Sequence, residues 1–258
     1  MISLVQFQEY FHHIAEQQYE AVKIPTFTLY FHPSEPLTFF NYGIPTATDI
    51  ETIESVLSTV RTEFASRNRR ARFEYLEELN PSLGAILKQH GFVEESRDML
   101  MVCNPDTYIP SVNVADLVIE EVTKNSGVGD AQQFLTIQTR GFGGEETEVA
   151  SAESARQFLR MLGQGRAYIG RLAEEPVAVG MIMETYNGIC ELAGLATLAE
   201  YRRQGIATAI TRIAVEQAFN HGAEVVFLTA ADEHAGRVYH KVGFENYTMV
   251  LTYTDNDI

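Results

Sequence analysis

The last third of the chain alternates between apolar and polar positions with periods that predict a strand, a helix and a second strand. Residues 189–197 form a short, mostly apolar run that is typical of a buried strand. Apolar residues then recur at helical spacing, and Gly222 marks the end of this helix. Residues 223–229 are β-branched and apolar, which favours a second strand. The apolar positions of the helix are Ile206, Ile210, Ile213 and Ala214.

A short helix completes this order, and further elements precede it. Asp232 is a favourable cap for the short helix, and the pair Gly243-Phe244 ends it. Together the elements predict an α/β (α+β) fold with a mixed central sheet flanked by helices. The apolar positions of the short helix are Ala235, Val238, Tyr239 and Val242. The earlier elements are strands near 117–122, 166–172 and 177–185 and helices near 130–139 and 152–162.

The N-terminal half carries a second copy of the short-helix pattern. Residues 80–92 align without gaps on residues 232–244, so that Gly91 and Gly243 lie 152 positions apart. Both segments begin with Asn or Asp and end in Gly-Phe. The pair Asn80-Pro81 predicts a helix start, because proline suits the first helical position. Chance similarity between two capped helices is the alternative interpretation.

Strand-like runs flank the N-terminal copy as well, at residues 71–76 and 99–102. We therefore expect two tandem domains, 1–110 and 111–258. Their boundary is expected in residues 104–111, a polar segment flanked by prolines.

The segment 201–208, Tyr-Arg-Arg-Gln-Gly-Ile-Ala-Thr, has the properties of an anion-binding turn. It precedes a helix, whose first amides have no intrahelical partner and whose dipole adds positive charge. Gly205 and Ala207 lack bulk, so a diphosphate can approach the backbone closely. Arg202 and Arg203 add charged donors. An ordinary helix start with a solvated basic tip is the alternative, and the turn is neither a Walker loop nor a Gly-x-Gly-x-x-Gly turn.

The order of strand, Arg-x-x-Gly-x-Ala turn, helix, strand and Asp-x-x-Ala-x-x-Val-Tyr-x-Lys-x-Gly-Phe helix resembles the GCN5-related N-acetyltransferase (GNAT) superfamily over about residues 115–254. The resemblance implies that the turn binds the diphosphate of acetyl-CoA and that the end of the preceding strand pairs with its pantetheine arm. It implies that Tyr239 is the general acid. Asp232 is a departure, because this position is often Asn in the family. The residues assigned to acetyl-CoA are Leu195, Ala196, Thr197, Arg202, Arg203, Gln204, Gly205, Ile206, Ala207, Thr208 and Asp232.

Acetyl transfer from a thioester needs a donor for the oxyanion, an acid for the leaving thiolate and a neutral amine. The backbone N–H groups of Leu195 and Ala196 are candidates for the oxyanion donor. Tyr239 could protonate the sulfur, whereas a half-buried aromatic on an amphipathic helix is the alternative. Glu191 is our candidate general base and Glu184 a second one. Proton transfer to water, with both carboxylates on a solvated strand face, is the alternative.

The N-terminal copy lacks these groups. Leu87 occupies the place of Tyr239, and residues 39–48 contain no Arg-x-x-Gly-x-Ala turn before the long helix expected at about 49–66. We therefore expect a degenerate GNAT-like half that neither binds CoA nor catalyses, but buttresses or shapes the acceptor cleft.

A glycine-rich loop, residues 141–146, joins the two early helices of the C-terminal half. In the family these helices line the acceptor side of the cleft. Glu145, Glu146 and Glu148 could therefore attract an ammonium group, and the glycines would let the loop move. A surface loop that runs into an acidic helix start is the alternative.

The composition of the chain limits the kinds of binding partner that it can have. A net charge of −16 over 258 residues argues against nucleic acid or an anionic membrane. Cys103 and Cys190 are too few and too far apart for a zinc site or a disulfide framework, and the histidines show no metal-ligand spacing. Residues 1–13 do not form a signal peptide, and no apolar run reaches about 18 residues. We expect a cytoplasmic protein without a metal ion.

The expected function is N-acetyltransfer. Acetyl-CoA, as cosubstrate, would give its acetyl group directly to a primary amine of a small molecule or peptide. A non-catalytic acyl-CoA sensor or scaffold and a transferase of another acyl group are the rivals. The acceptor, the general base and the oligomeric state stay open.

Overall fold

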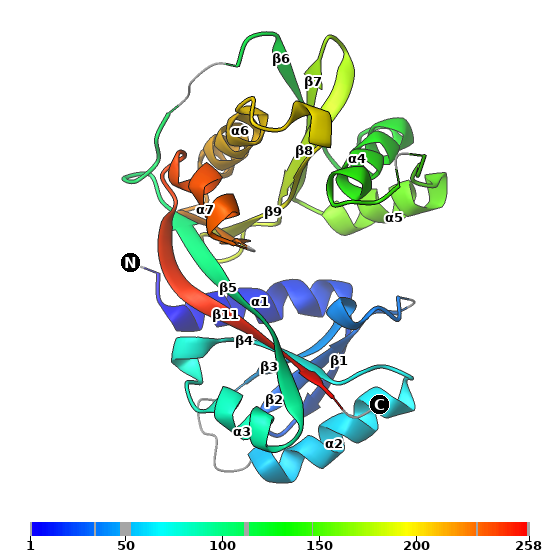
Figure 1. The fold of residues 1–258 in the computed structure, drawn as a ribbon, viewed down its shortest axis with the longest axis vertical. Helices are drawn as coiled ribbons and strands as arrows, with labels where there is room; N and C mark the ends of the chain where they lie inside the picture. Colours follow the sequence, from blue (N-terminus) through cyan, green and yellow to red (C-terminus); the bar gives the residue numbers. More distant parts are fainter. Residues whose placement is uncertain are drawn as a thin grey trace. The chain divides into compact units, whose positions relative to one another are not determined.

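The computed structural model describes residues 2–33, 35–46, 53–110, 114–145, 147–230 and 232–256. The chain forms two compact units, coloured along the sequence in Figure 1. Unit 1 consists of Met1–Leu100 and Tyr247–Ile258, and unit 2 consists of Met101–Asn246. Each unit contains a mixed sheet with helices on its faces, as the sequence predicts.

In unit 1 the strands lie in the order β1-β2-β3-β4-β11-β5. The first three strands are antiparallel, β3 and β4 are parallel, and β11 is antiparallel to β4. The elements are α1 (Leu4–Gln18), β1 (Glu20–Ile24), β2 (Phe27–Phe31), β3 (Asn41–Pro45), α2 (Ile53–Ser66), β4 (Arg72–Leu76), α3 (Leu83–Gln89), β5 (Phe92–Cys103) and β11 (Glu245–Asp255), with 3-10 turns η1 (Thr38–Phe40) and η2 (Glu77–Leu79).

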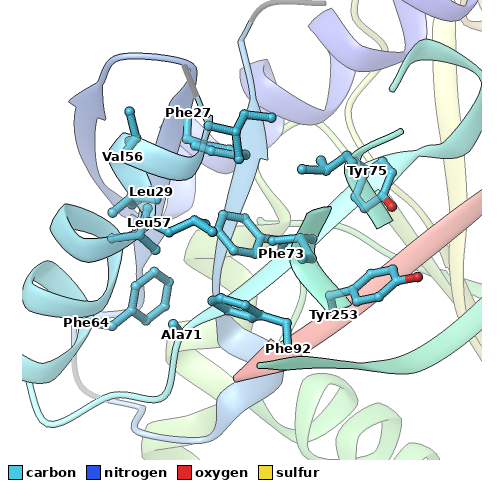
Figure 2. Packing of buried hydrophobic residues seen from close by; sticks show 14 of the residues in the cluster. Phe27, Leu29, Val56, Leu57, Phe64, Ala71, Phe73, Tyr75, Phe92 and Tyr253 are labelled. Carbon is cyan, nitrogen blue, oxygen red and sulfur yellow. The ribbon is translucent and has the colours of Figure 1, made fainter. Parts of the chain in front are cut away.

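The core of unit 1 is aromatic, and Phe73 lies at its centre in Figure 2. Its ring centroid is 4.7 Å from that of Phe27 and 5.2 Å from that of Phe92. All five residues of β2 are buried, because this strand is covered on both faces. Phe27, Leu29 and Phe31 pack with α2 and α3, whereas Tyr30 packs with Ala15 of α1.

In unit 2 the strands lie in the order β10-β9-β8-β7-β6, with the end of β5 beside β10. The run from β6 to β9 is antiparallel, and β9 and β10 are parallel. The elements are β6 (Leu117–Val122), α4 (Val128–Gly141), α5 (Ala152–Leu162), β7 (Arg166–Leu172), β8 (Glu175–Ile182), β9 (Ile189–Thr197), η3 (Ala199–Tyr201), α6 (Ile206–Asn220), β10 (Val225–Ala230) and α7 (Glu233–His240).

Helices cover both faces of the unit 2 sheet (Figure 1). The apolar residues of α4 and α5 pack against Ala167, Ile169 and Val179 on one face. On the other face α6 approaches closely, because Gly170 and Gly180 leave room for Ile210. A Cβ atom on either glycine would lie 3.1 Å or 3.0 Å from the Ile210 side chain. This packing places α6 directly against β7 and β8.

The two units repeat one succession of elements, as the internal sequence repeat predicts. An antiparallel meander is followed by β3-α2-β4-α3-β5 in the first half of the chain and by β9-α6-β10-α7-β11 in the second. In both, a helix connects two parallel strands.

The structure divides the chain differently from the predicted domains 1–110 and 111–258. Residues 247–258 belong to unit 1, where β11 pairs with β4 from Val250↔Leu76 to Thr254↔Arg72. Residues 101–110 belong to unit 2, where the amide of Ile109 donates to the Val242 carbonyl over 2.9 Å. The cause is strand pairing between residues far apart in sequence, which hydropathy does not encode.

A second difference concerns Asn80, which was expected to cap a helix. Residues 77–79 form η2, and Asn80 ends that turn. The helix α3 therefore begins only at Leu83, whose amide donates to the Asn80 carbonyl over 3.1 Å, and Ser82 is its N-cap without a side-chain hydrogen bond. Residues 49–52 of the longer helix expected before it lie outside the described residues.

Candidate functional site

The parallel strands β9 and β10 separate near the middle of the unit 2 sheet. Their register has three pairs, from Val225↔Ile189 to Phe227↔Glu191. Beyond Glu191, β9 continues to Thr197 and β10 to Ala230. The backbone of β9 that follows Glu191 is therefore available on this side to a ligand that pairs in strand-like fashion.

A β-bulge interrupts β9 in the same stretch. The register with β8 shifts between Val179 and Met181, and Gly194 has a φ of 61°. The Gln138 side chain of α4 donates to the Gly194 carbonyl over 3.4 Å. Any other residue would be strained at this φ, and its Cβ atom would lie 2.3 Å from Gln138 Nε2, so the Gln138 side chain would have to move. The bulge redirects the residues that follow it, which include Leu195 and Ala196, whose amides are the candidates for the oxyanion donor.

The predicted anion turn follows the end of β9. Arg203 and Gly205 both have positive φ angles, 64° and 82°, and Gly205 is the N-cap of α6. The first helical hydrogen bond of α6 runs from the Ala209 amide to the Gly205 carbonyl over 3.0 Å. Among the described residues, the amides of Ile206, Ala207 and Thr208 donate to no backbone acceptor. This arrangement of amides and left-handed residues is typical of an anion-binding nest.

A cavity of about 640 Å³ opens at this turn. Four cationic side chains lie around it: Arg202 and Arg203 from the turn, Arg237 from α7 and Lys241 directly after α7. The full lining is Thr197, Ala199, Tyr201, Arg202, Arg203, Gly205, Ile206, Ala207, Thr208, Arg237, Val238 and Lys241. Positive charge and free amides therefore meet in one concave region that suits a polyanionic ligand.

Arg202 lines the cavity and also bonds to two backbone carbonyls. Its Nε donates to the Thr197 carbonyl over 3.0 Å and one Nη to the Gly141 carbonyl over 2.9 Å. The guanidinium thereby joins the end of β9 to the end of α4 and holds the turn between them. Gln204 is exposed, and its amide donates to the Glu200 carbonyl over 3.4 Å.

Tyr239 is half-buried on α7, and its ring centroid lies 6.0 Å from that of Phe244. Burial raises the pKa of its phenol above the ordinary 10.0, so the group carries its proton at neutral pH. The cavity lining, over the described part of the chain, includes Val238 but not Tyr239. Asp232 caps α7, with Oδ1 accepting from the Ala235 amide over 2.7 Å.

The two candidate bases lie away from the cavity. Glu191 is half-buried at the last position of β9 that pairs with β10, and neither it nor Glu184 lines the cavity. Glu184 follows β8 and approaches Gly163 after α5, where a Cβ atom would lie 3.7 Å from its Oε2. The structure therefore does not bring the candidate bases together with the anion turn.

The loop after α4 is exposed and tethered. Arg140 donates to the Glu148 carbonyl over 3.0 Å, and the Ala150 amide donates to Thr136 over 3.1 Å. Glu145 and Glu148 are exposed, and Glu146 lies outside the described residues. Two apolar side chains of this loop, Phe142 and Val149, are 67% and 66% exposed, and no sequence pattern singled them out. The same holds for Gln138, which no local sequence pattern connects to the bulge.

Residues 131–244, which lie within unit 2, match the family model of the acetyltransferase (GNAT) family. Three solved structures share the fold over most of the chain. A GCN5-related N-acetyltransferase from Kribbella flavida has a TM-score of 0.83 and 23% identity, with 100% of this chain and 97% of that chain covered.

The second structure is a tandem GNAT protein from the clavulanic acid biosynthesis pathway, with a TM-score of 0.65 and 14% identity over 88% of this chain and 77% of that chain. The third is a GCN5-related N-acetyltransferase from Sphaerobacter thermophilus, with a TM-score of 0.66 and 13% identity over 89% and 76%. The fold of this chain is thus that of tandem GNAT proteins. No curated protein matches the sequence.

Two further findings concern the described residues only. None of their helices is long and apolar enough to cross a membrane. Their His, Cys, Asp and Glu side chains form no group of three that could hold a metal ion.

Proposed function

We propose that unit 2 binds acetyl-CoA and transfers its acetyl group to a primary amine of a small molecule or peptide. The observation that carries this proposal is the nest of free amides from Ile206 to Thr208, directly after a strand that is bulged and unpaired on one side. A diphosphate fits the nest, and the pantetheine amides fit the free edge of β9.

The residues of the chain would act on the bound thioester in defined ways. The amides after the bulge, from Leu195 and Ala196, would stabilise the oxyanion that forms when the amine attacks the carbonyl carbon. Tyr239, protonated because burial raises its pKa, would give its proton to the departing sulfur. Glu191, directly or through water, would accept the proton that the amine loses.

Unit 1 is the degenerate partner in this proposal. Leu87, fully buried on α3, stands at the position of Tyr239 and belongs to the apolar core. The residues described before α2 include no Arg-x-x-Gly-x-Ala turn. The chemistry of the chain would therefore belong to unit 2, in a cytoplasmic protein with buried free cysteines.

Tyr239→Phe tests the catalytic role. Release of CoA thiol would be measured over a panel of amines, together with acetyl-CoA affinity and melting temperature. We expect kcat to fall on the order of 10² while acetyl-CoA affinity is kept. Because burial raises the pKa of Tyr239, the phenol stays protonated from pH 7 up to 10.0, the ordinary pKa of tyrosine. The kcat of the wild type should therefore exceed that of the variant throughout this range and approach it only at higher pH.

Two other outcomes would redirect the proposal. Unchanged turnover in the variant would remove Tyr239 as the acid. Tight acetyl-CoA binding without turnover of any amine by the wild type would favour an acyl-CoA sensor, which agrees with the place of Tyr239 outside the cavity lining. Titration with other acyl-CoA thioesters separates acetyl from a different acyl donor.

A further inference from the structure

Unit 1 contains a second cavity, of about 270 Å³, where α2 ends and β4 begins. Three arginines line it, Arg61, Arg69 and Arg70, with the single carboxylate of Asp255. The remaining lining is apolar: Phe64, Ala65 and Ala71. Phe64 and Ala71, both labelled in Figure 2, also belong to the aromatic core, so this wall is part of the packed interior of unit 1. The chain as a whole has 19 basic and 35 acidic side chains, and three arginines against one acid are therefore unusual here.

One of the three arginines is neutralised within the protein. Arg61 Nε lies 2.7 Å from Asp255 Oδ2, and its Nη2 lies 3.1 Å from Oδ1. The same Nη2 donates to the His90 carbonyl over 2.5 Å. The side chain of Asp255 is only 7% exposed. The carboxylate is thus fully engaged by Arg61.

Arg69 and Arg70 have no carboxylate partner among the described residues. Arg69 Nη1 donates to the carbonyls of Arg67 and Asn68, and its Nε is buried without a hydrogen-bond partner. Arg70 Nε donates to the Asp255 carbonyl over 2.5 Å. The neighbouring Arg67 and Arg72 differ, because each forms ion pairs with glutamates. Among the residues that the structure describes, these two positive charges have no carboxylate partner, and the buried Nε of Arg69 is a donor without an acceptor.

We propose that this cavity binds a phosphate group, as inorganic phosphate or as the phosphate of a small phosphomonoester. A phosphate dianion matches the guanidinium charges of Arg69 and Arg70, and its oxygens accept the forked donors that arginine presents. The apolar wall strengthens these contacts by excluding water. The site lies in unit 1, so it does not rest on the acyltransferase activity proposed for unit 2.

Phosphate binding to the full chain tests the site. The protein would be titrated with inorganic phosphate by calorimetry at constant ionic strength. Saturating dephospho-CoA, which carries a diphosphate but no phosphomonoester, would be present to occupy the turn of unit 2. The variant is Arg69→Gln/Arg70→Gln. Its charge-matched control is Arg156→Gln/Arg160→Gln, two exposed side chains of α5 that face no cavity described above.

We expect the wild type and the control to bind one phosphate, and the Arg69→Gln/Arg70→Gln variant to bind it at least about tenfold more weakly. Arg69→Lys, which keeps the charge but loses the fork, should fall between them. Melting curves without phosphate show whether each variant is folded. Equal phosphate affinity in wild type and the double variant would overturn the proposal. So would wild-type binding of succinate as tight as that of phosphate, since the site would then not select phosphate.

Discussion

At the scale of single residues, glycines decide the shape of the unit 2 site. Gly205 allows the left-handed turn before α6, and Gly194 allows the bulge in β9. Both angles are unfavourable for residues with a side chain. Arg202 then holds the ends of β9 and α4 together through two carbonyls. The local sequence therefore specifies a backbone conformation first and side-chain chemistry second.

Gly194→Ala should distort this site. Its Cβ atom would collide with Gln138 Nε2, and its φ of 61° would be strained, so we expect a loss of about 2 kcal/mol in the free energy of unfolding. The KM for acetyl-CoA should rise as well. Chemical denaturation and steady-state kinetics measure the two effects.

Gly129→Ala is the matched control, because no atom lies within 4 Å of the added Cβ on α4. It should leave the KM unchanged and stabilise the protein by up to about 1 kcal/mol. A second substitution, Gln138→Ala, made in the Gly194→Ala variant would remove the collision but not the strained φ. It should restore part of the free energy of unfolding that Gly194→Ala loses. If Gly194→Ala were as stable as the wild type, the bulge would not require glycine.

At the scale of elements, α7 contributes charge to the cavity of unit 2. Arg237 and Lys241 are four positions apart, so they lie on one side of the helix and both line the cavity. In the proposed complex, the backbone nest before α6 would bind the diphosphate of CoA. We expect Arg237 and Lys241 to pair with another phosphate group of the same ligand, the 3′-phosphate.

Arg237→Gln/Lys241→Gln should therefore weaken binding of CoA more than binding of dephospho-CoA, which lacks the 3′-phosphate. We expect about a tenfold loss for CoA at low salt, and a smaller loss at high salt because exposed charges are screened. Calorimetry with both ligands measures the ratio of affinities. The Arg156→Gln/Arg160→Gln variant again serves as the control. Equal losses for both ligands would show that the pair does not select the 3′-phosphate.

Local patterns predicted most elements and the anion turn, because caps, apolar periods and glycine angles act within a few residues. Asp232 caps α7, and the turn around Gly205 has its amides free, as the sequence predicts. Three features could not be predicted. The bulge at Gly194 depends on Gln138, the role of Arg202 depends on Gly141, and the place of β11 depends on β4. Each of these contacts joins residues that are far apart in the sequence. Local sequence patterns therefore do not predict them.

At the scale of the whole molecule, the unit boundary passes through strands instead of a linker. β5 and β11 each contribute residues to both units, and β11 completes the sheet of unit 1 between β4 and β5. A cut that treats the polar segment 104–111 as a linker would leave two incomplete sheets.

The fragment 111–258 should therefore fail to behave as an independent domain. It would expose the edge of β11 that β4 covers in the full chain, and unpaired strand edges promote aggregation. We expect aggregation or poor dispersion of amide signals in NMR spectra, whereas the full chain gives a folded spectrum. A soluble fragment with native-like spectra and acetyl-CoA affinity would contradict this expectation.

The place of β11 also has a consequence for biosynthesis. The N-terminus of a chain leaves the ribosome first, and domains generally fold as they emerge during synthesis. Here the sheet of unit 1 is incomplete until residues 247–255 are present, and these residues are translated after all of unit 2. Until then β4 has an open edge on the ribosome. The half made first should consequently reach its native state last, and its early strands should be the segment of the nascent chain most in need of chaperone protection.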